Sequence, residues 1–302
     1  GCGWAGCLRL SGASEAKRSG CFNTNHCRGT RLSDMKHTPD ARRPLDITRL
    51  REVLVDDGPF ARLDYSLSTD STNADLLRAE QDGAPEWTVS TTEFQDSGRG
   101  RLGRPWIAPE KALVMFSVLF RPDPAQLSHL GTIPLACGLA LMDTLRDLGV
   151  DGAGLKWPND VLLNAKKLCG ILVEAASLDT RPAVVIGIGI NIDLTTEELP
   201  VPHATSLSLA GHDIDRTDFL IAVLGNIRTR LMEWSQGENT WLDAYREVCS
   251  SLGQDVRVIL PGEKELLGVA VGIASGGQLM VRDQSGEVHT LNAGEVTHLR
   301  LQ

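Results

Sequence analysis

The stretch of the sequence with the clearest chemical potential alternates glycine and arginine, as Gly98-Arg99-Gly100-Arg101-Leu102-Gly103-Arg104. Glycines allow positive φ angles and a close approach of the backbone to a ligand. Successive N–H groups in such a loop can form a concavity that binds anions. The forked guanidinium groups suit phosphate and carboxylate. These residue types predict a loop that handles phosphate, and the alternative is an exposed turn with solvated arginines.

The same glycines have the GxGxxG spacing of dinucleotide-binding folds, which need a helix that opens inside the glycine run. Here Pro105 and Pro109 follow instead, and bulky arginines occupy the gaps. The glycine-rich loop of protein kinases is excluded too, because neither an HRD nor a DFG element occurs downstream. The loop therefore belongs to another class of phosphate site.

A second polar cluster is the turn Lys156-Trp157-Pro158-Asn159-Asp160, which lies between two apolar runs. Asp160 offers hard oxygen ligands of the kind that Mg²⁺ prefers. Lys167 begins the next predicted strand and can point its ammonium into a cleft. A lysine alone is more often solvated, but the adjoining Asn159 and Asp160 favour a functional site here.

Two further patterns each leave two interpretations open. Asp70-Ser71-Thr72-Asn73 is first a helix N-cap, and a helix N-terminus also presents free N–H groups to a ligand. Gly187-Ile188-Gly189-Ile190-Asn191 lies inside an apolar strand. Glycine there indicates close approach either of a ligand or of another packed chain segment.

The elements that position these residues predict an α+β body followed by a small β domain. We predict strands over 62–67, 87–94, 112–120, 154–157, 161–163, 168–175 and 184–192, and helices over 46–55, 72–79, 127–148, 217–234 and 240–250. After Gly253, five short strands over 256–260, 266–273, 278–281, 288–291 and 296–301 alternate with Gly-containing turns. This spacing is typical of a small barrel. The expected domains are 46–252 and 253–302.

Residues 1–45 differ from the rest in composition. They hold eight Lys/Arg and three Asp/Glu, which leaves 22 against 36 in the remaining chain. The segment is interpreted as a disordered or non-native extension, with an organellar transit peptide as the alternative. Its four cysteines lack the close CxxC pairs of a zinc site. The acidic body argues against a general nucleic-acid binder, and no apolar run has the length of a membrane helix.

Taken in order, the motifs resemble the biotin–protein ligase family. They are Ser71-Thr72-Asn73, Gln95 with the Gly/Arg loop up to Trp106, the Lys156–Asp160 turn with Lys167-Leu168-Cys169-Gly170, and 187–191. The resemblance runs from about residue 46 to the C-terminus. It implies a catalytic domain like that of class II aminoacyl-tRNA synthetases, with a mixed sheet, and an SH3-like C-terminal barrel.

The resemblance also implies an activity: an ATP-dependent ligase that forms biotinyl-5′-AMP with Mg²⁺ and transfers biotin to a lysine of the biotin carboxyl carrier domain of acetyl-CoA carboxylase. Lys167 and Arg101 would be catalytic, and Asp160 would hold the metal. The implied biotin contacts are Ser71, Thr72, Asn73, Gln95, Arg99, Gly100, Arg101, Lys167 and Gly187. The implied ATP contacts are Arg99, Arg101, Trp106, Asn159, Asp160 and Asn191.

Two other functions agree less well with the sequence. A lipoate or octanoyl transferase of the same fold group gives no reason for the Gly/Arg loop combined with the Lys156–Asp160 turn. A DNA-binding repressor needs a winged helix, and the region before Ser71 predicts only one helix and one strand. We therefore expect a monofunctional cytoplasmic ligase without specific DNA binding. The sequence is compatible with two oligomeric states, a monomer and a weak homodimer.

Overall fold

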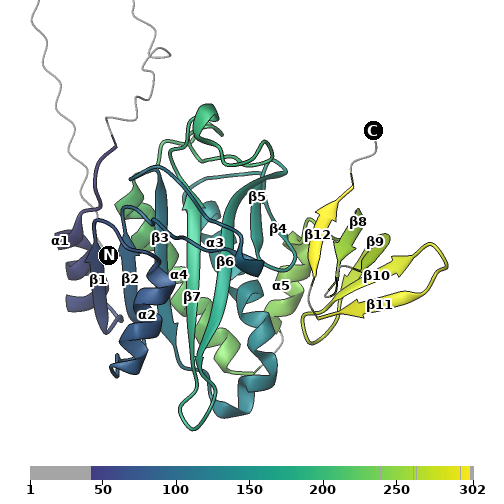
Figure 1. The fold of residues 1–302 in the computed structure, drawn as a ribbon, viewed down its shortest axis with the longest axis horizontal. Coiled ribbons are helices and arrows are strands. Elements are labelled where there is room, and N and C mark those ends of the chain that lie inside the picture. The colour runs from purple at the N-terminus through teal and green to yellow at the C-terminus, as the bar shows by residue number, and fades with distance from the viewer. Residues whose placement is uncertain (1–41, 238–239, 261, 263, 293, 300–302) are drawn as a thin grey trace, which may run out of the picture. The chain divides into compact units, whose positions relative to one another are not determined.

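A seven-stranded mixed sheet forms the centre of the fold (Figure 1). The computed structural model describes residues 42–302 apart from 238–239, 261, 263, 293 and 300–302. The strand order is β1-β2-β3-β7-β6-β5-β4, with β1 and β2 parallel and the other pairs antiparallel. The strands are β1 (Arg62–Ser66), β2 (Thr88–Thr92), β3 (Leu113–Phe120), β4 (Ala153–Lys156), β5 (Asp160–Leu163), β6 (Lys166–Ser177) and β7 (Ala183–Asn191). The predicted α+β class with a mixed sheet is confirmed.

Side-chain alternation along β3 gives the sheet two different faces. Phe116 and Val118 join the large core that holds the buried residues of α3 (Ile133–Asp147) and α4 (Arg216–Ser235). Leu119 points the other way, into a smaller cluster with Leu76 of α2 (Thr72–Gln81). The helix α5 (Thr240–Val248) also joins the large core. The two faces explain why β3 is apolar at every position but Ser117.

Helix boundaries follow a capping residue in one case and a proline in another. Asp46 accepts a hydrogen bond from the Arg49 N–H at the start of α1 (Ile47–Arg51), which continues as the π-helix η3 (Glu52–Asp56). The predicted helix over 127–148 is wrong in its first part, where η5 (Pro124–Thr132) is a 3₁₀ helix. Pro134 has no N–H, so the α-helix cannot run through it from further upstream.

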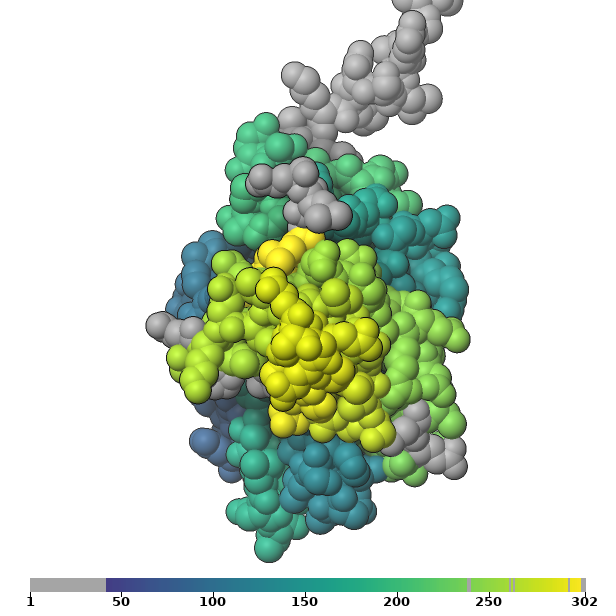
Figure 2. Space-filling model, turned by 90° about the vertical axis from the view of Figure 1, so that its right-hand side faces the viewer, coloured from purple at the N-terminus to yellow at the C-terminus, as the bar shows by residue number. Residues whose placement is uncertain are grey.

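The C-terminal strands form a second, five-stranded antiparallel sheet, which confirms the predicted small β domain. Its order is β11-β10-β9-β8-β12. The strands are β8 (Asp255–Ile259), β9 (Glu265–Ile273), β10 (Leu279–Asp283), β11 (Val288–Leu291) and β12 (Glu295–His298). In the space-filling view of Figure 2 this part of the chain, yellow-green to yellow, faces the viewer. Their buried residues Val256, Val258 and Leu279 join the same core as α3 and α4.

The start of the described chain corrects one expected boundary. The Arg42 guanidinium bonds to Asp193 and Glu198, and Leu45 is buried with its N–H donating to Glu93. Arg42 and Leu45, which the composition assigned to the N-terminal extension, therefore contact the folded body. Uneven composition could not reveal this, because the contacts join residues far apart in sequence. Residues 1–41, with the cysteines Cys2, Cys7, Cys21 and Cys27, lie outside the described residues.

One helical stretch in the described part of the chain, Pro124–Asp147, is long and apolar enough to span a membrane by composition alone. More than half of that window is buried inside the protein, and the apolar residues of α3 join the core. Cys137, Cys169 and Cys249 are also buried and unbonded to one another. Burial raises the pKa of the Cys137 and Cys169 thiols, so neither is a ready nucleophile.

Candidate active site

A cleft of about 1210 Å³ opens beside the N-terminus of α2. Its volume exceeds the roughly 300–1,000 Å³ of an ordinary small-molecule pocket, so it has space for two substrates. Every residue that the sequence assigned to the site lines it. They are Ser71, Thr72, Asn73, Gln95, Arg99, Gly100, Arg101, Trp106, Asn159, Asp160, Lys167, Gly187 and Asn191.

The inner end of the cleft, defined by Ser71, Thr72, Asn73, Gln95 and Gly187, is built on the sheet surface. Gly187 of β7 lies in register between Ser117 of β3 and Leu172 of β6. The Asn73 side chain covers it so closely that a Cβ on Gly187 would lie 2.1 Å from Asn73 Oδ1. A packing contact is therefore one reason for glycine at this position.

The N-cap prediction for Ser71 is wrong for its side chain. Ser71 has the extended backbone of an N-cap residue, but its hydroxyl makes no capping hydrogen bond. Instead, Gln95 Oε1 accepts from the Thr72 N–H at 2.9 Å and from the Thr72 hydroxyl at 3.2 Å. Gln95 thus takes over the capping role, and Ser71 lines the cleft.

The outer end of the cleft is defined by the Gly/Arg loop, Trp106, Lys156, Asn159, Asp160, Lys167, Glu295 and His298. The Gly/Arg loop is a tight hairpin. The Gly100 N–H donates to Arg104 O at 2.7 Å, and the Trp106 N–H donates to Gly98 O at 2.8 Å. Leu102 has a φ of 57° at its tip and is 79% exposed. The chain then leads to β3, without the helix that a dinucleotide-binding fold requires. Exclusion of that fold is confirmed.

The two central arginines of the hairpin have different surroundings. Arg101 Nη1 donates to Asn159 Oδ1 at 3.1 Å and to Gly294 O at 3.4 Å. Burial lowers the pKa of Arg101 from its ordinary value, yet a guanidinium stays protonated in proteins. Asn159 is fixed in turn, because its Nδ2 donates to Ile171 O at 2.9 Å. Arg99 is exposed on the cleft rim.

Asp160 lies between two lysines at the centre of the outer end. Its carboxylate oxygens are 2.7 Å from Lys167 Nζ and 3.6 Å from Lys156 Nζ. The Lys167 backbone is held by its N–H, which donates to His203 O at 2.7 Å. The ammonium also lies 5.5 Å from the centre of the Trp106 ring. Lys167 therefore points into the cleft, paired with a carboxylate that an anionic ligand would replace.

Trp106 lies flat on the sheet because two strand residues lack side chains. A Cβ on Gly189 would be 2.5 Å from Trp106 Nε1, and one on Gly170 would be 3.3 Å from its Cζ3. Asn191, at the end of β7, donates from Nδ2 to Thr205 O at 2.9 Å. That bond supports the segment that holds Lys167, so the structure gives Asn191 a supporting contact besides its place in the cleft wall.

The site assignments from the sequence leave out several residues of the outer end, although Arg104 and Lys156 lie within the motifs. Arg104 pairs with Glu295, and this bond lowers the pKa of the Glu295 carboxyl. His298 Nε2 lies 2.9 Å from Ser251 Oγ, and burial lowers the pKa of this histidine. Lys156 also lines the cleft. Nothing in the sequence indicates that Glu295 meets Arg104.

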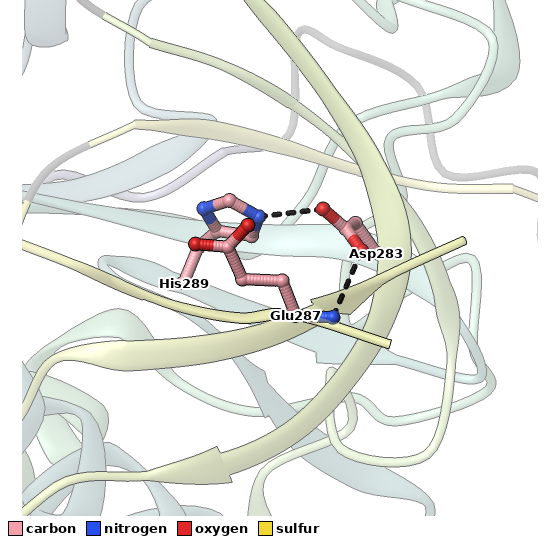
Figure 3. Close-up of side chains that lie close together, drawn as sticks. All are labelled: Asp283, Glu287 and His289. Atoms are coloured by element: carbon pink, nitrogen blue, oxygen red, sulfur yellow. Dashed lines mark hydrogen bonds and ion pairs between the residues drawn. The ribbon is translucent and has the colours of Figure 1, made fainter. Parts of the chain in front are cut away.

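A separate cluster of metal-ligating types lies on the β10–β11 hairpin, outside the cleft (Figure 3). His289 Nε2 is 2.7 Å from Asp283 Oδ2. Asp283 Oδ1 accepts from the backbone N–H groups of Ser285 and Glu287. The hydrogen bond from His289 is the largest of the causes that lower the Asp283 pKa to about 2. These bonds give the cluster a structural role in the turn.

Comparison with known proteins connects this fold and cleft to one class of ligase. The model of the biotin/lipoate A/B protein ligase family matches residues 65–191, and that of the biotin protein ligase C terminal domain matches residues 251–299. The chain is 38% identical to the biotin–[acetyl-CoA-carboxylase] ligase of Mycobacterium tuberculosis, over 86% of this chain and 97% of that protein. The chain belongs to the biotin protein ligase family.

Two other relatives extend the comparison. The bifunctional ligase/repressor BirA of Escherichia coli is 30% identical, over 84% of this chain and 79% of that protein. The solved structure of the Aquifex aeolicus biotin protein ligase in complex with biotin and ATP matches with a TM-score of 0.68 and 28% identity. That match covers 80% of this chain and all of the other.

Proposed function

We propose that this chain is a biotin–[acetyl-CoA-carboxylase] ligase. It joins biotin and ATP into biotinyl-5′-AMP and then transfers biotin to a specific lysine of the biotin carboxyl carrier domain of acetyl-CoA carboxylase. The observation that carries the proposal is the division of one cleft into a buried neutral end and a cationic end. This division suits a neutral ring joined to a triphosphate.

The inner end binds the biotin ring system. Ser71, Thr72, Asn73 and Gln95 are each less than a tenth exposed, and they present hydroxyl and amide groups. Apolar walls with a few placed polar partners are typical of sites for compact neutral ligands. The biotin carboxylate then points toward Arg101 and Lys167. We also assign Arg99, Gly100 and Gly187 to this substrate.

Adenylation joins two anions, since the biotin carboxylate attacks the α-phosphorus of ATP and pyrophosphate leaves. The cationic groups of Arg99, Arg101 and Lys167 offset the repulsion and stabilise the charge that develops on the phosphoryl oxygens. By analogy with removed oxyanion donors, each contributes about 3 kcal/mol. Trp106 packs near the adenine, and Asn159 and Asn191 complete the nucleotide contacts.

The donor set of the cleft fits a magnesium ion that is held mainly by nucleotide phosphates. Asp160 is one carboxylate flanked by two lysines, and in the described part of the chain no group of three acidic, histidine or cysteine ligands lines the cleft. Mg²⁺ is commonly bound by one or two carboxylates together with phosphates. The ion would supply Lewis-acid neutralisation of phosphate charge, with Asp160 as its protein ligand.

Transfer completes the reaction without a covalent enzyme intermediate. The carrier lysine amine attacks the carboxyl carbon of biotinyl-5′-AMP, the amide forms and AMP leaves. The Gly/Arg hairpin covers the adenylate during this step and keeps water from the anhydride. We assign the two substrate sites to the domain 46–252 and closure of the outer end to the domain 253–302.

One assay tests the activity. The full chain is incubated with ATP, Mg²⁺, labelled biotin and a carboxylase carrier domain, and label on the carrier lysine is the expected result. Labelled lipoate in place of biotin is expected to leave the carrier unlabelled. A folded protein that transfers no biotin would contradict the proposal. Efficient transfer of lipoate would instead support the alternative of a lipoate or octanoyl transferase.

DNA binding and oligomeric state are each tested by a separate measurement. We propose a cytoplasmic enzyme without specific DNA binding, and between residues 42 and 70 the structure has only α1, η3 and β1. A gel shift on the upstream DNA of its own gene, with biotin and ATP present, is expected to show no specific complex. We also propose a weak homodimer, and sedimentation with and without biotin and ATP measures it.

A further inference from the structure

Two polar side chains behind the cleft wall fix the amide of Asn73, although neither lines the cleft. Ser117 Oγ donates to Asn73 Oδ1 at 2.6 Å. Asn73 Nδ2 donates to Glu174 Oε2 at 2.7 Å. Ser117 is fully buried and Asn73 is 4% exposed. Asn73 is therefore held from β3 and from β6 at once, with Gly187 of β7 beneath it.

The chemistry of Glu174 decides which way this amide points. A carboxylate only accepts hydrogen bonds, so the amide nitrogen of Asn73 must face Glu174 and its oxygen must face Ser117. The second amide hydrogen is directed at Leu172 O, 3.5 Å away. Both hydrogens are thus used on the protein side. Only a lone pair of Oδ1 remains for a ligand, so Asn73 acts as an acceptor.

Gln95 has the opposite polarity. Its Oε1 is occupied by the Thr72 N–H and hydroxyl. Among the described residues its Nε2 has one weak partner, Met115 Sδ at 3.5 Å, so an N–H remains for a ligand. The inner end therefore offers one donor and one acceptor on neighbouring side chains. A cyclic urea, with its carbonyl flanked by N–H groups, has the complementary pattern.

We propose that Glu174, together with Ser117, is a positioning residue that sets the polarity of the biotin subsite. By orienting Asn73 as an acceptor, it makes the site select a ring with a free N–H at that point. This inference rests on the proposed function. It assigns to Glu174 a role in ligand discrimination that acts through Asn73, since Glu174 itself does not line the cleft.

Calorimetry on the full chain tests the proposal with four variants. Glu174→Ala is expected to weaken biotin binding about tenfold to a hundredfold, because the freed amide loses its fixed polarity. Glu174→Gln keeps an acceptor oxygen and is expected to recover most of the affinity. Ser117→Ala is expected to weaken binding severalfold. Glu265→Ala is the matched control, because Glu265 is exposed and pairs with Arg257. The KM for ATP is expected to stay within about twofold throughout.

A second probe separates positioning from simple structural support. Biotin analogues methylated on one or the other ureido nitrogen remove one N–H each. The wild-type protein is expected to reject one of the two by about a hundredfold, and Glu174→Ala to narrow that ratio to about tenfold or less. A mainly structural residue would weaken biotin and both analogues by the same factor.

The inference is overturned if folded Glu174→Ala keeps wild-type affinity and discrimination, or if it binds biotin and both analogues more weakly by the same factor. If Glu174→Ala does not fold, wild-type behaviour of both Glu174→Gln and Ser117→Ala overturns it. Thermal unfolding of each variant identifies the folded ones. A wild-type protein that binds no biotin would instead overturn the proposed function and this inference with it. The two failures are therefore distinguishable.

Discussion

The two ends of the cleft are built on different physical principles. At the inner end, Ser71, Thr72, Asn73 and Gln95 are buried, and most of their polar atoms are bonded to other parts of the protein. At the outer end, the hairpin tip is exposed, and the charged groups pair with one another. A neutral ring needs a preformed surface, whereas phosphates need cations that can exchange one partner for another.

The difference has an energetic basis. A buried amide left without partners costs about 1–3 kcal/mol, so the inner end must be complete before the ligand arrives. An ion pair such as Lys167–Asp160 is only partly buried, and partly solvated pairs contribute little to stability. Lys167 can therefore leave Asp160 for a phosphate at small cost. Variants at the outer end should affect turnover, and those at the inner end should affect biotin affinity.

The largest effect is expected from Lys167→Ala. Loss of the ammonium removes one donor to the developing phosphoryl charge, and adenylate formation is expected to fall about 10²- to 10³-fold. Pyrophosphate release measures it. Biotin affinity is expected to change much less, because Lys167 lies at the other end from Asn73 and Gln95. An unchanged adenylation rate would remove Lys167 from its assigned role, and a change confined to biotin affinity would contradict the division of the cleft.

The next largest effect is expected from Arg101→Gly. This change removes the guanidinium that bonds Asn159 and Gly294, so the hairpin should cover the adenylate less well. Free biotinyl-5′-AMP is expected to appear in solution about tenfold faster, by the loss of a charge-assisted hydrogen bond. Chromatography of the reaction mixture measures it. Arg99→Gly on the exposed rim is the comparison, and equal leakage from both variants would count against a special role for Arg101.

A smaller effect is expected from Gly187→Ala, and it should fall on biotin affinity instead of on adenylation. The added Cβ would lie 2.1 Å from Asn73 Oδ1, so Asn73 must shift and the inner end loses its geometry. We expect the KM for biotin to rise about tenfold, by analogy with the cost of one displaced hydrogen bond. The KM for ATP should change little. Gly225→Ala, where the added Cβ meets nothing within 4 Å, is the control, and an ATP effect as large as the biotin effect would contradict the comparison.

The smallest effect is expected from Glu295→Gln. Arg104 lowers the pKa of Glu295, so this pair stabilises the fold above the ordinary glutamate pKa and its contribution is lost as the pH falls through the lowered value. Both side chains are partly exposed, so the change at pH 7 should stay below about 1 kcal/mol. Thermal unfolding at pH 7 and under acidic conditions measures it. A larger effect, or one that persists in acid, would mean that the outer end is as rigid as the inner end.

The sequence was sufficient to predict the sheet and the location of the site. Apolar runs such as 184–192 gave the strands of the seven-stranded sheet within one or two residues, whereas the last predicted strand, 296–301, ends earlier, at His298. The residues assigned from the ordered motifs all line the cleft. Motif residues are visible because their types are unusual at their positions. Gly98 to Arg104 is the clearest case, since no ordinary turn needs that alternation.

The remaining features depend on partners that are distant in sequence. Ser117 is a single polar residue in an apolar strand, and Glu174 is one acid near a strand end, so neither stands out until the fold places Asn73 between them. The capping role of Gln95 likewise needs the approach of α2. Arg42 meets Asp193 and Glu198 only in the folded chain. Periodicity and composition carry no information about such pairs.

The hydrogen bonds of Trp157 limit how the two domains can be exchanged among relatives. Its indole N–H donates to Gly277 O at 2.9 Å, in the turn between β9 and β10 of the C-terminal domain, and its backbone N–H donates to Ser251 Oγ. The ring is 2% exposed, and it directly precedes the segment that carries Asn159 and Asp160. A grafted C-terminal domain would therefore have to reproduce a backbone carbonyl at the place of Gly277. The two domains are expected to be inherited as one unit, because the joint between them is also part of the site.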